Sequence, residues 1–433
     1  MNQRFTIENL GKTVVGNPIS DIDPAHFLDD SERIVMDPRA AEIDRCFKGG
    51  LFPESFEVAG SRNPIFFEPA KVTAAIVTCG GLCPGLNAVI RSIVLQLHHR
   101  YGVRKIHGIR YGYQGLAKKA PEGPLLLSPE NVDDIHLRGG SILGSSRGAP
   151  PVPEMLDALV GLGVDMLFTI GGDGTMRGAL AIHEEIKRRK LAIAVVGIPK
   201  TIDNDIPFVR RSFGFETAVD IACQAVHAAH TEALGVENGI GVVKLMGRES
   251  GYIAANAALA TGHVNFCLVP EVPFSIEGEH GLLGLLRTRL KHKKHALIVA
   301  AEGAGQQYFA ASERPRDASG NIKMGDIGIL LKERLPVLLK NASMAVSVKY
   351  IDPSYIIRAA AANPADQVFC NKMAQNAVHA AMAGKTGLLI GYWHGRMTHV
   401  PLRALGNEKQ KINPDGELWQ TVLETTGQPP RIG

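Results

Sequence analysis

A lone carboxylate set among glycines is the first feature of this sequence that can do chemistry. Residues 169–178 read TIGGDGTMRG, and Asp173 stands in that stretch directly after an apolar run. Glycine lets a ligand approach bare N–H groups, and a following helix adds its positive end, so such a turn suits an anion such as phosphate. A carboxylate beside phosphate requires a cation between them, for which Mg²⁺ is the usual choice. Asp173 is therefore a candidate metal ligand. The alternative is that it caps a helix beginning near Thr175.

Two more glycine-rich loops follow expected strands in the same region. Residues 78–85 read TCGGLCPG, and residues 140–148 read GSILGSSRG, with Arg147 near the end. A strand-to-helix turn often needs glycine for packing alone, but three such loops in one region, with an arginine and an aspartate among them, favour phosphate binding. None has the spacing of a Walker loop or of a dinucleotide-binding fingerprint. The phosphates would have to be held by another scheme.

The stretch TIDND at residues 201–205 places two carboxylates after a third strand. If the chain is extended there, Asp203 and Asp205 face the same way. Two neighbouring like charges shift each other's pKa, which suits a general base with a supporting acid. The alternative is a turn rich in Asp and Asn, for which these residues are also suited. The position at a strand end favours the catalytic interpretation.

Charged side chains follow strand ends further along the chain. Arg248 lies in MGR after the strand expected at residues 240–245, and Glu302 lies in AEG after the strand expected at 297–300. Tyr355 and Arg358 come next. Arginine forks bind phosphate well, although each of these residues alone is more simply a solvated surface group.

The elements that position these residues alternate between apolar strands and helices. Unbroken apolar strands indicate a parallel sheet covered on both faces, with ligands beyond the carboxyl ends of the strands. The alternation restarts beyond Arg210, so we expect an α/β protein with two doubly wound, Rossmann-like lobes. Residues 1–70 show no sustained periodicity and are expected to be an irregular extension. The expected strands are residues 72–78, 166–170, 192–197, 240–245, 266–269, 297–300 and 344–348, and the expected helices include 87–98, 176–189 and 217–230.

Composition narrows the class of protein. With 433 residues, 45% hydrophobic and 21% charged, the chain is long enough for two or more globular domains. A net charge of +4 is too balanced to indicate nucleic-acid or membrane-surface binding. The six cysteines lack zinc-site spacing, so reduced cytoplasmic thiols are expected. No apolar run approaches about 20 residues, and the N-terminus is unlike a signal peptide.

Together the motifs resemble those of the 6-phosphofructokinase family. GGLCPGLN, LGSSRG, GGDGT, PKTIDND, MGR, AEG and YIIR occur in order between about residues 72 and 402. GGDGT alone also occurs in NAD kinases and diacylglycerol-type lipid kinases, but the set is specific. The segment AGSR at residues 59–62 and the long N-terminal extension are similar to those of the plant, trypanosome and actinobacterial branch.

The resemblance implies transfer of the γ-phosphoryl group of ATP to the 1-hydroxyl of fructose 6-phosphate, the committing step of glycolysis. It implies Asp203 as the general base, supported by Asp205, and places Thr201 in the same catalytic pocket. It also implies Asp173 on Mg²⁺ and Arg147 on the transferring group. The ATP-binding residues would be Gly80, Arg147, Gly148, Gly172, Asp173, Gly174 and Thr175. The sugar-phosphate-binding residues would be Thr201, Ile202, Asp203, Met246, Gly247, Arg248, Glu302, Tyr355, Ile356, Ile357 and Arg358.

Two positions bear on the phosphoryl donor. In pyrophosphate-dependent relatives an aspartate takes the place of Gly174 and a lysine the place of Lys200; in short bacterial ATP enzymes both are glycine. A carboxylate at position 174 would repel the α-phosphate of a nucleotide, so Gly174 favours ATP. Lys200 is compatible with either donor, and pyrophosphate remains the alternative.

The resemblance also implies domain boundaries and partners. Residues 1–70 would form the extension, 71–214 the nucleotide lobe completed by about 357–433, and 215–356 the fructose 6-phosphate lobe. A homodimer or homotetramer is expected, and allosteric control is expected without an assigned effector site. A non-catalytic regulatory subunit is a remote alternative, because such chains usually lose the base or the metal carboxylate. Asp173, Asp203 and Asp205 are all present here.

Overall fold

The chain folds into two compact units, seen in a computed structural model that describes residues 3–21, 27–309, 323–406 and 408–433. Unit 1 comprises Met1–Thr201, Ile206–Gly214 and Ala360–Glu408, and unit 2 comprises Ile202–Asp205, Phe215–Ala359 and Lys409–Gly433.

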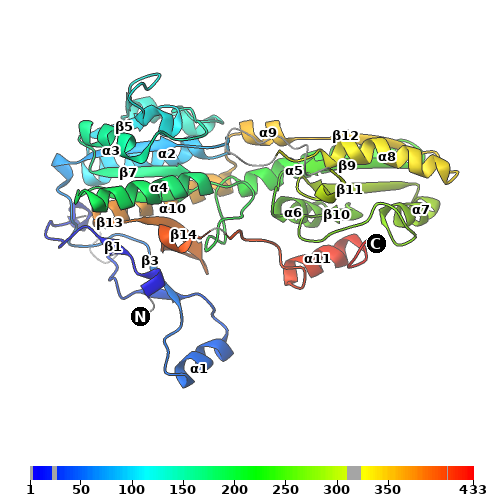
Figure 1. The fold of residues 1–433 in the computed structure, drawn as a ribbon, viewed down its shortest axis with the longest axis horizontal. Coiled ribbons are helices and arrows are strands. Elements are labelled where there is room, and N and C mark those ends of the chain that lie inside the picture. The colour runs from blue at the N-terminus through cyan, green and yellow to red at the C-terminus, as the bar shows by residue number, and fades with distance from the viewer. Residues whose placement is uncertain (1–2, 22–26, 310–322, 407) are drawn as a thin grey trace. The chain divides into compact units, whose positions relative to one another are not determined.

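Unit 1 is built on a mixed sheet of nine strands among the described residues (Figure 1). Its central strands run parallel, and antiparallel strands extend both edges. In spatial order they are β2 (Arg33–Val35), β3 (Ser55–Val58), β15 (Arg396–Pro401), β14 (Leu388–Trp393), β8 (Ala194–Pro199), β7 (Met166–Gly171), β4 (Thr73–Thr78), β5 (Lys105–Ile109) and β6 (Leu125–Leu126).

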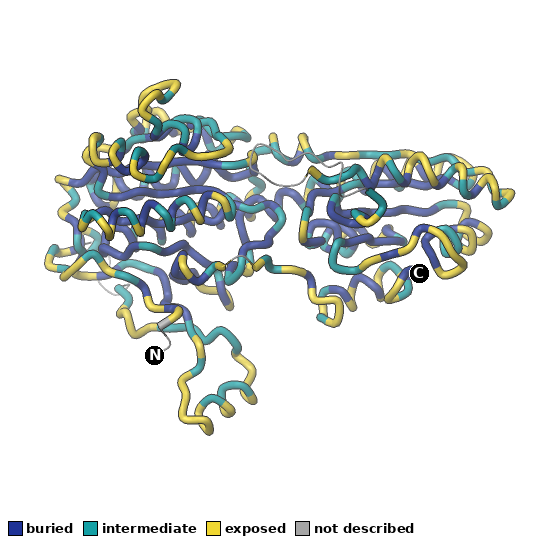
Figure 2. Tube along the Cα trace, viewed as in Figure 1, coloured by how far each residue is buried: buried dark blue, intermediate teal, exposed yellow. Residues whose placement is uncertain are grey.

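Every residue of β4, β7 and β8 is buried, which explains their unbroken apolar sequences (Figure 2). Helix α2 packs against α10, and α3 packs against α4, so helices sandwich the sheet as the sequence predicts. The helices of unit 1 are α1 (Ala40–Lys48), α2 (Leu86–Leu95, continued by a π-helical turn over Gln96–Tyr101), α3 (Val152–Gly161), α4 (Asp173–Arg188) and α10 (Pro364–Met382).

Unit 2 contains a parallel sheet of four strands in its described part. The order is β10 (Phe266–Leu268), β11 (His295–Ala301), β9 (Gly239–Leu245) and β12 (Ser347–Ile351). Its helices are α5 (Phe215–Leu234), α6 (Tyr252–Thr261), α7 (Leu282–Lys293), α8 (Ile327–Asn341), α9 (Ser354–Ala359) and α11 (Glu417–Thr426). Apolar side chains of α7 and α8 pack on β9 and β11 in one core, whereas α5 packs with α6.

The N-terminal extension is more ordered than the sequence predicts. Instead of an irregular segment, it contributes β2 and β3 to the sheet of unit 1, and β1 (Glu8–Asn9) pairs with β13 (Lys385–Thr386). These strands are two to four residues long. That is too short for an alternating pattern to be recognised in the sequence.

Buried ion pairs hold the extension to the rest of unit 1. Glu57 Oε1 accepts hydrogen bonds from Arg62 Nη2 at 3.1 Å and His399 Nδ1 at 2.9 Å, and pairs with Lys385 Nζ at 2.8 Å. Burial opposes ionisation, but His399 and Lys385 lower the pKa of Glu57 to about 2. Asp30 adds a second carboxylate to Arg62 and Lys385.

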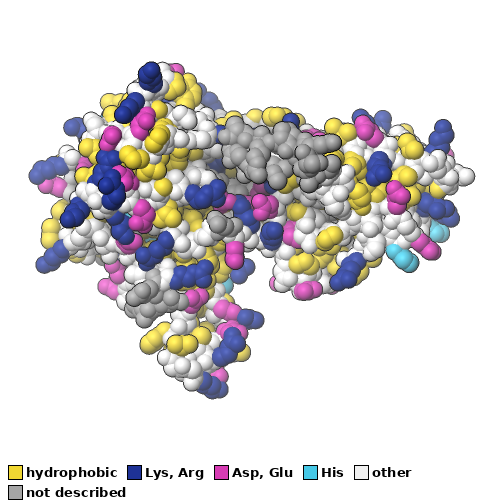
Figure 3. Space-filling view, in the orientation of Figure 1, with side chains coloured by type: hydrophobic (Ala, Val, Ile, Leu, Met, Phe, Trp, Pro, Cys, Tyr) yellow, Lys and Arg dark blue, Asp and Glu magenta, His cyan; other side chains and the backbone are white. Residues whose placement is uncertain are grey.

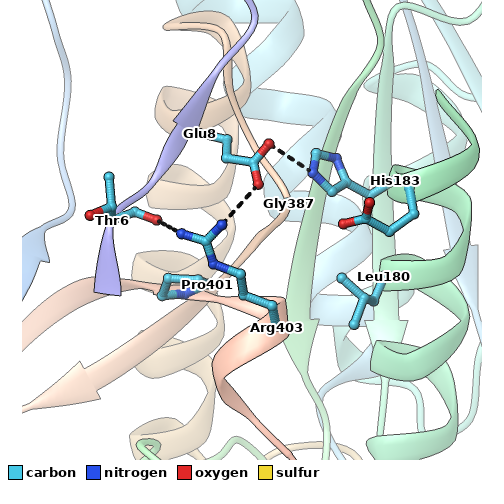
Figure 4. A pocket seen from close by; sticks show the side chains of 8 residues that line it. Thr6, Glu8, Leu180, His183, Gly387, Pro401 and Arg403 are labelled. Carbon is cyan, nitrogen blue, oxygen red and sulfur yellow. Dashed lines mark hydrogen bonds and ion pairs between the residues drawn. The ribbon is translucent and has the colours of Figure 1, made fainter. Parts of the chain in front are cut away.

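A second set of contacts surrounds Glu8 beside a small pocket (Figure 4). The Glu8 carboxylate lies 3.4 Å from His183 Nε2, 3.0 Å from Lys187 Nζ and 3.3 Å from Arg403 Nη1. Arg403 also donates to the Thr6 carbonyl at 3.1 Å. The start of the chain is therefore anchored to both α4 and the strand end at β15.

Helix α1 differs from the other helices of unit 1, because none of its residues is buried. Phe47 and Phe52 are 58% and 80% exposed, and their rings meet edge to face. The segment around α1 presents apolar side chains beside charged ones (Figure 3).

Some element boundaries differ from those expected. The strand expected at residues 344–348 is β12, three residues further on, and the helix expected from about Met176 begins at Asp173. Residues 409–433, expected to complete the nucleotide lobe, belong to unit 2, where α11 packs on α6 and β10. Among the residues described, no helix is both long and apolar enough to cross a bilayer.

Candidate active site

Two of the three glycine-rich loops leave the carboxyl ends of β4 and β7, and β4, β7 and β8 are neighbours in the sheet. The loop at residues 140–148 follows a short 3-10 turn (Ile135–Leu137), so the expectation that it leaves a strand is wrong. Cys79 N donates to Ile170 O at 3.0 Å, and Lys200 N donates to Gly171 O at 2.9 Å. Gly80 has a φ of +85°, which an L side chain rarely adopts, so the turn after β4 requires glycine. The strand ends therefore bring Gly80, Gly171 and Lys200 into one small region.

Lys200 points into this region. Its side chain is buried, and its ammonium donates to Gly81 O. A Cβ on Gly80 would lie 3.5 Å from Lys200 Nζ, and one on Gly172 would lie 3.4 Å from Lys200 O. The ammonium thus lies beside the turn after β4, whereas the backbone carbonyl of the same lysine faces the turn at Gly172. A cation beside a glycine turn is compatible with binding of a phosphate chain.

The loop at residues 140–148 is fastened to the turn after β4. Gly80 N donates to Ser146 O at 3.1 Å, the Ser145 hydroxyl donates to Gly80 O, and the Thr78 hydroxyl donates to Gly144 O at 2.7 Å. Arg147 and Gly148 follow these anchors, and both are exposed. The arginine is therefore on a fixed loop with its side chain open to solvent.

Asp173 is the first residue of α4, and Gly172 is the N-cap. The capping alternative for Asp173 is therefore wrong, because the first turn forms two residues earlier than expected: Thr175 N and Met176 N both bond to Gly172 O. An acid in the first turn is favoured by the helix dipole. That leaves the Asp173 carboxylate partly exposed at the carboxyl end of β7.

The glycines of this stretch fall into two kinds. A Cβ on Gly171 would lie 2.1 Å from Thr175 Oγ1, and one on Gly178 would lie 2.6 Å from Tyr113 Cε2, so packing excludes side chains at both. A Cβ on Gly174 would meet only Arg177 Nη2, at 3.9 Å. Packing does not require glycine at 174, although glycine weakens a helix. The missing side chain there calls for another reason, such as room for a ligand.

The donor set around Asp173 fits Mg²⁺. The described residues contain no group of three or more His, Cys, Asp or Glu side chains suited to holding a metal. Mg²⁺ commonly takes one or two carboxylates and completes its octahedron with phosphate oxygens and water. One partly exposed carboxylate next to glycine turns is compatible with that arrangement.

Asp203 lies in unit 2, in a turn rather than an extended segment. Asn204 has a φ of +54°, so the expected geometry of Asp203 and Asp205 as same-facing strand residues is wrong. Asp203 Oδ1 is buried, Arg248 N donates to Oδ2 at 3.5 Å, and the Ser250 hydroxyl donates to Asp203 O at 2.9 Å. Burial, followed by the charges of Asp205 and Glu302, raises the pKa of Asp203 to about 7.

Asp205 is buried and ion-paired. Lys409 Nζ lies 2.8 Å from Asp205 Oδ2, and Gln410 N donates to Asp205 O at 2.9 Å. Burial lowers the pKa of Lys409 to about 8. The electrostatic coupling expected between Asp203 and Asp205 is present, although the backbone geometry expected to produce it is not.

The MGR and AEG turns interlock at the carboxyl ends of β9 and β11. Glu302 N donates to Leu245 O at 2.8 Å, and Gly303 N donates to Gly247 O at 3.0 Å. A Cβ on Gly303 would lie 1.9 Å from Arg248 O, so the backbones can approach only with glycine there. Burial raises the pKa of Glu302, and the nearby charges of Arg248 and Arg358 oppose that shift.

The other expected acceptor residues have unequal environments. In α9, Tyr355 and Ile356 are 85% and 67% exposed, whereas Ile357 is fully buried, so Ile357 can offer a ligand only its backbone. Ile202 and Met246 are also buried in unit 2. Thr201 is the last residue of its segment of unit 1, where its carbonyl accepts a hydrogen bond from Ser212.

Sequence reasoning missed several side chains that support these groups. Ser250 and Lys409 contact the two aspartates, and the Tyr113 hydroxyl donates to Thr175 O at 2.8 Å in the first turns of α4. Nothing local in the sequence marks Lys409 or Tyr113. Lys244 is different, because a lysine inside the apolar strand β9 is a visible exception.

Unit 1 thus combines glycine turns, cations and a carboxylate at strand ends, and unit 2 combines arginines with buried carboxylates, a composition typical of phosphoryl-transfer enzymes. The phosphofructokinase family matches residues 73–381, and the chain belongs to that family. It is 48% identical to the ATP-dependent 6-phosphofructokinase of Borreliella burgdorferi, covering 99% of this chain and 97% of that one. The enzyme of the same name from Trypanosoma brucei brucei is 46% identical, covering 92% and 82%.

Solved structures share the fold. A pyrophosphate-dependent phosphofructokinase from Marinobacter aquaeolei aligns with a TM-score of 0.67 at 21% identity, covering 82% of this chain and 91% of that one. Pichia pastoris phosphofructokinase in the T-state aligns with a TM-score of 0.64 at 21% identity, covering 84% and 37%. At these identities the likeness establishes the two-lobed α/β architecture and does not bear on the donor.

Proposed function

We propose that this protein transfers the γ-phosphoryl group of ATP to the 1-hydroxyl of fructose 6-phosphate, giving ADP and fructose 1,6-bisphosphate. The observation that carries the proposal is Asp203: its carboxyl group lies in the turn that follows β8, with Oδ1 buried, Oδ2 accepting from Arg248 N at 3.5 Å and the pKa raised to about 7 by burial. A base that titrates near neutral pH can accept a hydroxyl proton at working pH. Relatives with the ATP-dependent name, at 46–48% identity over most of the chain, support the same reaction.

In unit 1 the proposed role of the protein is to bind and neutralise the phosphoryl donor. Backbone N–H groups at Gly172 and Gly174 and the ammonium of Lys200 would hold the phosphate chain. The Gly80 N–H is already bonded to Ser146 O, so the part of Gly80 would be to let the phosphates approach closely. Arg147 would neutralise charge on the transferring group. Asp173 would hold Mg²⁺, which when bound supplies charge neutralisation for the phosphates. Phosphoryl transfer gains most of its rate from such positioning and electrostatics.

In unit 2 the proposed role is to bind the sugar phosphate and remove a proton. Arg248 and Arg358 would bind the 6-phosphate, and Glu302 would accept a hydrogen bond from a sugar hydroxyl. Asp203 would take the proton of the 1-hydroxyl as the oxygen attacks phosphorus. Asp205, held by Lys409 at 2.8 Å, supports the base by keeping its pKa high.

ATP is the proposed donor because position 174 is open. Apart from the chain neighbours and the backbone of its own helix, the nearest atom to a Cβ built on Gly174 is Arg177 Nη2 at 3.9 Å, so position 174 itself offers a nucleotide phosphate neither a clash nor a carboxylate. Steady-state assays of the purified protein with ATP and with pyrophosphate test this directly. We expect turnover with ATP to exceed that with pyrophosphate by at least about 100-fold, or 2.7 kcal/mol. Faster turnover with pyrophosphate would show that ATP is not the preferred donor.

The compartment and the oligomeric state of the protein are also proposed from the family resemblance. We propose a cytoplasmic enzyme that works as a homodimer or homotetramer. None of the six cysteines, all of which lie among the described residues, is in a disulfide, which suits a reducing compartment. Exposed Phe47 in α1 and exposed Phe52 just after it offer an apolar surface to a second copy. Sedimentation equilibrium on the full chain measures the state, and a monomer at micromolar concentration would contradict the proposal.

A further inference from the structure

One residue of β9, an inner strand of the unit 2 sheet, carries a charged side chain. Lys244 lies on β9 between Val243 and Leu245, both fully buried, and its own side chain is only 12% exposed. Its ammonium lies 2.6 Å from Asp326 Oδ2 and 2.8 Å from Asp352 Oδ2. Burial would lower the pKa of the lysine, but the hydrogen bonds with the two carboxylates raise it, so Lys244 stays charged.

Each of these carboxylates organises the start of a helix. Asp352 lies between β12 and α9, where its Oδ1 accepts a hydrogen bond from Ser354 N at 3.0 Å (Figure 1). Asp326 is the N-cap of α8 and accepts from Ile329 N at 3.0 Å. Helix α9 contains Arg358, whereas α8 contains none of the expected site residues. One lysine therefore links β9 to a helix of the candidate site and to a helix outside it.

Lys244 is also close to the interlocked turns that present the acceptor residues. The residue after it, Leu245, accepts the hydrogen bond from Glu302 N at 2.8 Å. Lys244 lowers the pKa of Glu302, and Asp352 raises it, so the pair acts on Glu302 with opposite signs.

We propose that Lys244 is a positioning residue for the sugar-phosphate site: by holding Asp352 at the start of α9, it fixes Arg358 for the 6-phosphate. The inference rests on the proposed function of unit 2 and deepens it. Lys244 itself need not touch the substrate. Without the ammonium, Asp326 and Asp352 would be two partly buried carboxylates repelling each other, and the start of α9 would move away from β9.

The test compares two partners of the same lysine. Lys244→Met removes the charge while keeping an apolar stem of similar length, and we expect the KM for fructose 6-phosphate to rise about 10-fold or more, with the KM for ATP within about twofold. Asp352→Asn should raise the same KM. Asp326→Asn is the matched control: it breaks the other half of the pair and should reduce stability without changing that KM. Lys244→Arg should restore most of the affinity.

A double-variant cycle and a pH profile separate positioning from general destabilisation. The effects of Lys244→Met and Asp352→Asn on the KM should be less than additive, because both break one contact. In an Asp203→Asn background, which removes the titration of the base, calorimetric binding of fructose 6-phosphate should weaken on the acid side as Glu302 is protonated. This acid limb should shift to higher pH in Lys244→Met and to lower pH in Asp352→Asn.

The outcomes are distinguishable from failure of the proposed function. If the unsubstituted protein neither binds nor phosphorylates fructose 6-phosphate, the proposed function is wrong. If it does both, and Lys244→Met changes only the unfolding midpoint, the positioning role is wrong. Equal effects of Asp326→Asn and Asp352→Asn on the KM would also reject it. Asp352→Asn leaves the contact between Lys244 and Asp326 in place, so it gives an answer even if Lys244→Met does not fold.

Discussion

The candidate donor site of unit 1 and the candidate acceptor site of unit 2 use the same fold element, the carboxyl end of a parallel strand, in different ways. Unit 1 offers mainly backbone: Gly80 at positive φ, the Gly172 N-cap and an open Gly174. Unit 2 offers mainly side chains: Arg248, Arg358, Glu302 and Asp203, whose charges act on one another.

The difference reflects what each ligand asks of the protein. A phosphate chain carries its own dense charge and can be bound by N–H groups and a helix terminus. A sugar phosphate has one charged end and several neutral hydroxyls, so it needs directional side chains. Specificity for the phosphoryl donor should therefore depend on glycines in unit 1, and specificity for the sugar phosphate should depend on charged side chains in unit 2.

The largest expected effect comes from the base. Asp203→Asn should lower kcat by about 10²- to 10⁴-fold, the usual contribution of general base catalysis. Binding of fructose 6-phosphate, measured by calorimetry, should change by less than about threefold because the shape of the side chain is kept. Near-normal turnover by this variant would show that Asp203 is not the base.

The pH dependence of the unsubstituted enzyme is a control for this variant. Because burial and then Asp205 raise the pKa of Asp203 to about 7, kcat/KM should fall tenfold per unit below that pH, and the residual rate of Asp203→Asn should not. The folded pKa lies above the unfolded one, so stability from Asp203 is present below about pH 4 and lost as pH rises toward 7. Asp203→Asn should therefore be the more stable protein at pH 8 and equally stable at pH 4 in denaturant titrations.

A smaller effect is expected at the donor site. Gly174→Asp adds a second carboxylate next to Asp173 in space that only Arg177 otherwise approaches, and should lower kcat/KM for ATP about 10- to 100-fold, which corresponds to roughly 1.4–2.7 kcal/mol. The KM for fructose 6-phosphate should not change. An equal loss of affinity for both substrates would contradict the division of roles between the two units.

The fold was predictable wherever burial leaves a continuous apolar run. β4, β7 and β8 are buried along their whole length, and the sequence places each within two residues. The predicted position of β12 was wrong by three residues. β12 is an edge strand with no fully buried residue, so no apolar run marks it in the sequence. The short strands of the extension leave no periodic signal.

The positions of the candidate site residues were predictable where they follow a strand, and not where the geometry depends on distant segments. The glycine turn after β4 and Arg248 after β9 do lie at strand ends, and the phosphate binding that they indicate stays a prediction. The turn at Asn204 and the ion pair from Lys409 to Asp205 depend on backbone conformation and on a segment some 200 residues away. Lys244 was detectable in principle, since a lysine in a buried strand needs partners, but the sequence does not say which carboxylates provide them.

The smallest expected effect tests whether each glycine of α4 is needed for packing or for ligand binding. Gly174 and Gly178 lie four residues apart in this helix. Gly178→Ala should destabilise the protein by about 1–3 kcal/mol, because its Cβ would overlap Tyr113 at 2.6 Å. Gly174→Ala should stabilise it by up to about 1 kcal/mol, because alanine is the better helix former and the space is open. Denaturant unfolding measures both. Loss of stability in Gly174→Ala would mean that position 174 is glycine for structural reasons, and the donor preference would then need another origin.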